Sequence, residues 1–198
     1  MTHRIDYFFA PQSPWTYLGH ARFVQMTQSI HDPLQVKPID LGKVFSVSGG
    51  LPLRERPPQR QAYRLTELTR FSRHLQLPLN LHPKYFPVAG DPAARLIIAV
   101  DMAHGTSAAL GISGAIFAAL WTQEQNIADE EVLKALLVQQ ALPLNCLDHS
   151  HSLEVLQRYE GYTQEAIDLG VFGAPTYVVD GEMFWGQDRL EFVAQALS

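Results

Sequence analysis

The segment FFAPQSPWTYL, residues 8–18, joins an apolar run to the first residues of a helix. The run from residue 4 to residue 10 is apolar and aromatic, which predicts a strand. Ser13 is a favoured N-cap and Pro14 suits the first helical position, so we expect a helix from about residue 14 to residue 28. The junction therefore sets the order strand, then helix, at the start of the chain.

The segments on either side complete a sheet. Residues 34–40 alternate in polarity and predict a second strand, parallel to the first because a helix separates the two. Pro38 within it favours an edge position. Near the C-terminus, residues 175–185 predict two strands joined by a turn at Asp180-Gly181, and residues 188–197 predict a last helix. The order predicts a mixed sheet of four strands.

A long helical block lies between the strands. Asp129 is expected to cap one of its helices and Gly105 to end another, while Thr163 is expected to cap a helix that follows the block. The hydrophobic periodicity predicts helices over residues 58–75, 92–104, 107–122, 129–142, 152–159 and 163–170. We therefore expect an α/β fold in which a helical domain is inserted into a sheet domain.

The composition permits a sizeable core and excludes several classes of partner. Of the 198 residues, 46% are hydrophobic, and the net charge of −5 gives no global attraction to nucleic acid or an anionic membrane. The single cysteine, Cys146, excludes an intrachain disulfide and a CxxC motif. Residues 1–12 lack a signal peptide's apolar stretch, and the uncharged residues 105–123 contain glycines and hydroxyls that favour a buried helix. We expect a cytoplasmic protein without a metal site.

Ser13 has two interpretations. It is a good helix cap and needs no further role. Alternatively, the free N–H groups and the positive end of the helix dipole favour an anion beside it, and its hydroxyl can donate a hydrogen bond to a thiolate. The residues alone leave both open.

Two later motifs are equally ambiguous. Ala174-Pro175 ends a loop, but a cis bond there would turn the backbone groups of Ala174 outward to pair with an extended peptide. Asp188 stabilises the dipole of the last helix in any case, and with Gln187, which we expect to be exposed, it could bind an ammonium group.

Arginines concentrate in one segment. Most of them are expected on the solvated face of a helix, while Arg54 and Arg56 precede the helix and could meet a carboxylate substrate. The segment from residue 53 to residue 73 contains Arg54, Arg56, Arg60, Arg64, Arg70 and Arg73.

Three motifs together resemble one family. FAPQSPWTYL near the start, FGAPTYVVDG late in the chain and MFWGQDRLEFV at the end resemble the 2-hydroxychromene-2-carboxylate isomerases. These are relatives of the kappa-class glutathione transferases within the DsbA-like branch of the thioredoxin superfamily. The resemblance implies a thioredoxin-like domain, residues 1–43 and 160–198, with an inserted helical domain, residues 44–159. It also implies a homodimer.

The resemblance assigns roles to residues of this chain. Ser13 would stand where disulfide oxidoreductases carry their reactive cysteine, and would be the catalytic residue that stabilises the thiolate of bound glutathione. A cis Ala174-Pro175 bond would present Ala174 to the cysteinyl part of glutathione. The γ-glutamyl end would be received by Trp185, Gly186, Gln187 and Asp188. Glutathione would act as a catalyst for isomerising a small aromatic-degradation intermediate.

One loop departs from the family pattern. Phe45 and Gly50 stand where the family commonly has a lysine and an asparagine, and Lys43 is shifted. We expect Gly49, Gly50 and Arg54 beside the substrate.

Two rival functions remain. One is a kappa-like transferase or peroxidase, and the other is a noncatalytic module that binds thiols or peptides. A disulfide oxidoreductase is excluded because Ser13 and Thr16 replace both cysteines.

Overall fold

A mixed sheet of four strands forms the centre of the protein, as the sequence predicts. The computed structural model describes residues 3–28 and 33–198. The strands β1 (Ile5–Phe9), β2 (Leu34–Pro38), β3 (Thr176–Val179) and β4 (Glu182–Trp185) lie in the order β2-β1-β3-β4. β1 is parallel to β2 and antiparallel to β3, and β3 pairs with β4 through the hairpin at Asp180-Gly181. The edge position of β2 agrees with Pro38, which has no N–H to donate.

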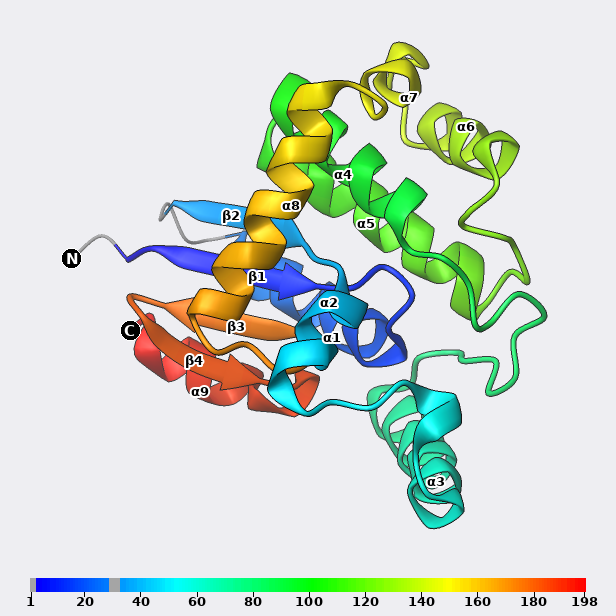
Figure 1. Ribbon diagram of the computed structural model, residues 1–198, viewed down its shortest axis with the longest axis vertical. Helices are drawn as coiled ribbons and strands as arrows, with labels where there is room; N and C mark the ends of the chain where they lie inside the picture. The colour runs from blue at the N-terminus through cyan, green and yellow to red at the C-terminus, as the bar shows by residue number, and fades with distance from the viewer. Residues whose placement is uncertain (1–2, 29–32) are drawn as a thin grey trace.

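Helices cover both faces of the sheet. α1 (Pro14–Thr27) and α9 (Leu190–Ala196) pack on the face to which Tyr7 and Tyr177 point. α2 (Leu41–Ser48) and α8 (Leu153–Asp168) pack on the opposite face, to which Phe8 and Val178 point. Figure 1 shows α8 crossing in front of the sheet and α9 behind it. The alternation along each strand therefore produces two apolar layers.

The helical block shares its core with the sheet. It comprises the short 3₁₀ turn η1 (Leu53–Glu55) and five helices, α3 (Pro58–Leu75), α4 (Asp91–His104), α5 (Thr106–Trp121), α6 (Glu130–Gln139) and α7 (Asn145–His149). Phe9 of β1 meets Phe117 of α5 at 5.5 Å between ring centroids, and both belong to one buried cluster. The domain boundaries drawn from the sequence, at 43/44 and 159/160, fall inside α2 and α8. Within the described ranges, no helix is long and apolar enough to span a membrane.

Most residues that the sequence predicts to begin or end a helix do so in the structure. Ser13, Asp129 and Gly105 hold the predicted cap positions, with Gly105 at φ 81°. Thr163 as a cap is wrong, because one helix, α8, replaces the two expected between residues 152 and 170. Ser152 caps it instead, and the Thr163 hydroxyl donates to the Tyr159 carbonyl and accepts from the Asp40 N–H at 3.0 Å. The sequence analysis also missed α2 and α7.

Candidate active site

Ser13 is a helix cap that also contacts a distant loop. Its Oγ accepts a hydrogen bond from the Thr16 N–H at 3.3 Å, which satisfies one free donor of α1. The same hydroxyl donates to the carbonyl oxygen of Ala174 at 3.4 Å. With only 7% of the residue exposed, the hydroxyl lies at the sheltered end of α1. The cap interpretation is therefore correct, and the geometry adds a contact with the second motif.

The loop before β3 is held from both sides. The Ala174-Pro175 peptide bond is cis, as the family resemblance implies. The Thr176 hydroxyl donates to the Gly173 carbonyl at 2.9 Å, and the Gly186 N–H donates to the Pro175 carbonyl at the same distance. These bonds fix Ala174 between Ser13 and the end of β4.

A cavity of about 590 Å³ opens beside this loop. Apart from Ser13, the resemblance assigns six residues to glutathione. Five of them line the cavity, and the sixth, Pro175, does not. Ser13 is not part of the lining but lies next to the cavity, since its hydroxyl bonds to Ala174 and Trp15, two positions further along the chain, lines the cavity. The lining residues are Trp15, Arg56, Gln59, Arg60, Tyr63, Arg64, Glu67, Phe71, Ala174, Trp185, Gly186, Gln187, Asp188 and Arg189.

Trp185 forms one wall of the cavity. Its indole lies directly against Gly173, where an added Cβ would fall 2.2 Å from the indole nitrogen. The ring of Phe172 packs against it at 4.7 Å between centroids, and about half of the Trp185 surface remains exposed. Gly173 therefore provides the space that lets the indole lie flat beside the loop.

Gln187 is buried, although the sequence predicts that it is exposed. Only 2% of its surface is exposed, and both its carbonyl and its side-chain oxygen accept hydrogen bonds from Arg22. Within the described part of the chain its Nε2 has no hydrogen-bond partner. Gln187 thus fixes the turn η2 (Gln187–Arg189) to α1 and retains one free donor.

Asp188 is the accessible carboxylate of this turn. Its side chain is partly exposed and forms an ion pair with Arg189 at 3.2 Å. It lines the cavity together with residues of α3. A ligand ammonium group can therefore reach it from the cavity, whereas Gln187 acts mainly by holding the backbone.

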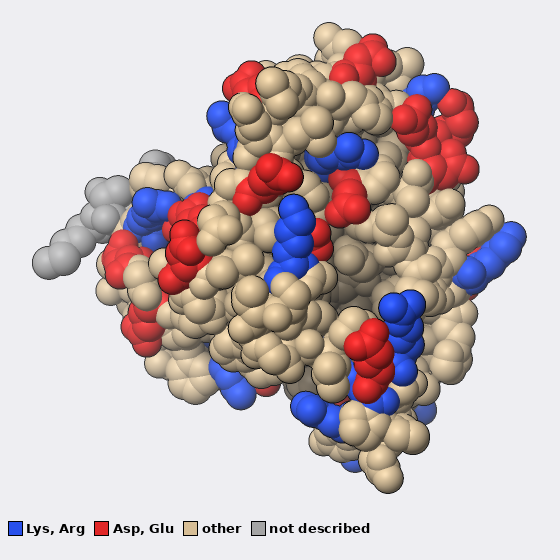
Figure 2. All heavy atoms as spheres, viewed as in Figure 1, with Lys and Arg blue, Asp and Glu red and all other residues tan. Residues whose placement is uncertain are grey.

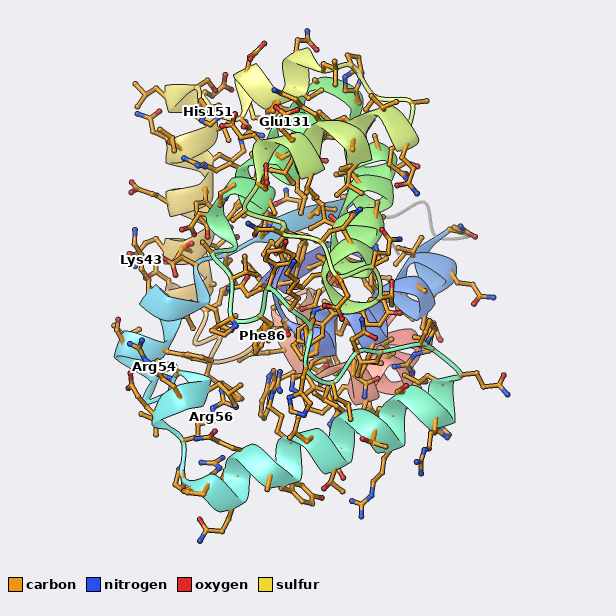
Figure 3. The ribbon with its side chains drawn as sticks, turned by 90° about the vertical axis from the view of Figure 1, so that its right-hand side faces the viewer. Lys43, Arg54, Arg56, Phe86, Glu131 and His151 are labelled. Carbon is orange, nitrogen blue, oxygen red and sulfur yellow. The ribbon has the colours of Figure 1, made fainter. Side chains whose placement is uncertain are left out.

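The residues expected beside the substrate lie elsewhere. Arg54 has 87% of its side chain exposed and pairs with Glu55 at 3.4 Å, while Arg56 lies where the segment enters α3 (Figure 3). Gly49 ends α2 at φ 76°, and Gly50 lies under the ring of Phe45. None of Gly49, Gly50 and Arg54 lines the cavity.

Sequence analysis missed the α3 wall of the cavity. Arg60 and Arg64 were assigned to a solvated face, but both line the cavity together with Tyr63 and Phe71. The available signal was the spacing of four residues between Arg60 and Arg64, which places two like charges on one side of the helix. Figure 2 shows Lys and Arg side chains gathered over the end of the molecule that α3 forms.

The lining of the cavity supplies no thiol. Its lining contains neither cysteine nor histidine. Cys146 lies on α7, outside the lining, and burial raises the pKa of its thiol. His20 is buried in the core, where its Nε2–H donates to the Leu110 carbonyl at 2.9 Å. A reactive sulfur would therefore have to arrive with a ligand, and Ser13 and the α1 N-terminus can stabilise its charge.

A second cavity, of about 910 Å³, lies between α1 and α5. It contains none of the residues that the sequence assigned to a site.

Comparison with known proteins agrees with this geometry. Residues 4–198 match the family model of the DSBA-like thioredoxin domain. A 2-hydroxychromene-2-carboxylate isomerase of Sphingobium xenophagum is 26% identical over all of this chain and 99% of its own length. A protein of the same name from Pseudomonas putida is 28% identical, covering 98% of this chain and 93% of its own.

Solved structures show the same fold. A 2-hydroxychromene-2-carboxylate isomerase superposes with a TM-score of 0.77 at 24% identity, covering 98% of this chain and 93% of the other. The cytosolic disulfide reductase DsbM from Pseudomonas aeruginosa superposes with a TM-score of 0.70 at 16% identity, covering 98% and 93%. The resemblance found in the sequence is thereby confirmed. The chain belongs to the family of DSBA-like thioredoxin domains.

Proposed function

We propose that the protein is a glutathione-dependent isomerase of 2-hydroxychromene-2-carboxylate or a related aromatic-degradation intermediate. The similarity to isomerases over nearly the whole length of both chains supports the reaction class. The observation that carries the proposal is the contact of Ser13 with Ala174 beside a cavity that also contains Asp188.

The residues present fit glutathione. The carboxylate of Asp188 suits the ammonium group of the γ-glutamyl end, and the backbone of Ala174 suits the cysteinyl part. Bound glutathione would supply a thiolate that adds reversibly to a conjugated double bond, so that this bond can rotate before the thiol is released. Besides capping α1, Ser13 would turn its hydroxyl from the Ala174 carbonyl to the sulfur, donate a hydrogen bond to it and lower the pKa of the thiol. Trp15 and Trp185 supply aromatic surface to the cavity walls.

A turnover assay tests the proposal. The isomerisation is followed with and without glutathione, and free thiol is titrated at the end. A rate that requires glutathione, with no thiol consumed, supports the isomerase. Consumption of thiol would instead indicate the kappa-like transferase or peroxidase. If the wild type shows no turnover of any kind and glutathione binding survives Ser13→Ala, the result would indicate a noncatalytic module.

A further inference from the structure

Three guanidinium groups on the α3 side of the cavity have no carboxylate partner within the described residues. Arg56, Arg60 and Arg64 line the cavity, and none forms an ion pair there. The two acids of the lining are paired with other arginines, Glu67 with Arg70 at 2.5 Å and Asp188 with Arg189 at 3.2 Å. The cavity therefore has an excess of positive charge on one wall.

Two of these guanidinium groups are partly buried. Arg64 lies over the ring of Phe86 at 5.3 Å, and burial together with the charge of Arg56 lowers its pKa to about 10. Arg56 lies over the ring of Phe45 at 5.9 Å, and its Nε donates to the Leu51 carbonyl at 2.8 Å. Burial and the charge of Arg60 lower the pKa of Arg56 as well.

The arrangement is costly without an anion. Arg60 and Arg64 are like charges four residues apart on α3 and repel each other, while Arg56 and Arg64 lose hydration through partial burial without a carboxylate partner among the described residues. Arg70 and Arg73, on the same helix, avoid this cost because both are exposed and Arg70 has Glu67. An anion between the three guanidinium groups would offset both penalties, and planar carboxylates suit the guanidinium fork.

We propose that Arg56, Arg60 and Arg64 form a subsite for a carboxylate of the ligand that occupies this cavity. The inference deepens the proposed function and rests on it for the class of ligand. Two carboxylates meet the chemistry, that of the glycine of glutathione and that of an aromatic carboxylate substrate. The rings of Trp15, Tyr63 and Phe71 line the same wall region and suit a planar ligand.

Calorimetry with matched ligand pairs tests the subsite. One pair is glutathione and its glycine ethyl ester, and the other is cinnamate and cinnamamide, titrated with and without saturating glutathione. The variants are Arg60→Gln, Arg64→Gln and the double variant, with Arg73→Gln as control for loss of charge on α3. Arg60 is exposed, so Arg60→Gln keeps the test independent of folding.

For one pair, the wild type should bind the carboxylate about tenfold tighter than its neutral form, and the double variant should lose that preference. Arg73→Gln should keep it. The pair that responds identifies which carboxylate the arginines bind. The subsite is overturned if the wild type binds the carboxylate and the neutral ligand equally well in both pairs. It is also overturned if the double variant keeps the preference for the carboxylate. If glutathione and its ester fail to bind while the cinnamate preference depends on the arginines, the proposed function fails and the subsite stands.

Discussion

The hydroxyl of Ser13 donates a hydrogen bond to the carbonyl oxygen of Ala174 at 3.4 Å, although 161 positions separate the two residues in the chain. This contact joins the capped end of α1 to the loop before β3. Both the stability of α1 and the proposed thiolate site depend on the same hydroxyl.

Ser13→Ala should separate these two roles. Loss of the cap should lower the free energy of unfolding by about 1 kcal/mol, and loss of the donor should reduce proton release on glutathione binding near neutral pH. Ser152→Ala is the matched control, since Ser152 caps α8 with the same 3.3 Å bond to an N–H three residues on. It should cost similar stability without changing proton release. Calorimetry in two buffers measures the protons, and equal proton release from all three proteins would contradict the role of Ser13.

Asp188→Asn should weaken glutathione binding about tenfold, because a neutral amide cannot pair with the ligand ammonium group. Glu191→Gln removes the same charge from an exposed position outside the cavity lining and should leave the affinity unchanged. A glutathione analogue without the α-amino group should bind wild type and Asp188→Asn alike. A large difference for that analogue would refute the ammonium contact.

Gly173→Ala should displace the indole of Trp185, because the new Cβ would lie 2.2 Å from its nitrogen. We expect a loss of about 1–3 kcal/mol in stability and weaker glutathione binding. Gly161→Ala has no atom within 4 Å of its new Cβ and should stabilise α8 by up to about 1 kcal/mol. Urea unfolding and calorimetry check both, and unchanged binding in Gly173→Ala would show that the indole does not shape the site.

His20 should make the protein less stable in acid. Burial lowers the pKa of its imidazole from 6.5 to about 4, even though the hydrogen bond to Leu110 opposes the shift. Between these two pKa values the unfolded chain binds a proton that the native protein does not, so stability falls as the pH falls from about 6.5 to 4. The loss from this group should approach about 3 kcal/mol at pH 4. In His20→Gln, urea unfolding across this window should show a shallower pH dependence, and an unchanged slope would contradict the assignment.

Lys37→Met should be strongly destabilising. The ammonium of Lys37 is buried, lies 2.7 Å from both carboxylate oxygens of Glu165 and 3.0 Å from Asp6, and faces the ring of Phe8. Removing it leaves the acids with Arg4 alone, at a cost of about 3 kcal/mol.

Lys43→Met is the control for Lys37→Met. The exposed pair of Lys43 with Glu160, at 3.7 Å, should contribute less than about 1 kcal/mol. An equal loss in the free energy of unfolding of the two variants would show that the buried pair contributes no more to stability than the exposed pair.

Local signals carried most of the fold prediction. Ser13, Asp129 and the Asp180-Gly181 turn each act through backbone geometry within four residues, which a sequence displays directly. The prediction that Thr163 caps a helix was wrong because it used a local signal alone, and a threonine can cap a helix or lie within one. Its actual partner, the Asp40 N–H, comes from another element.

The site was predicted where a motif covers it and missed where packing decides. Ala174 and Asp188 lie in the motifs that carry the resemblance. Arg60 and Arg64 have no such motif, and the orientation of α3 depends on a tertiary contact, 6.0 Å between the ring centroids of Phe71 on α3 and Trp15 on α1. The burial of Gln187 likewise depends on Arg22, which lies 165 positions away.

The antiparallel pairing of β1 with β3 also has a consequence for synthesis on the ribosome. β1 and the capped end of α1 emerge before the helical block, yet the loop carrying Ala174 and the turn carrying Asp188 emerge only after it. A nascent chain stopped before residue 174 holds α1 and α3 but has neither the opposite wall of the cavity nor the acceptor for the Ser13 hydroxyl. The proposed ligand can therefore bind here only after the chain as far as Asp188 has left the exit tunnel, and a translation product that stops before Ala174 cannot compete for it at this site.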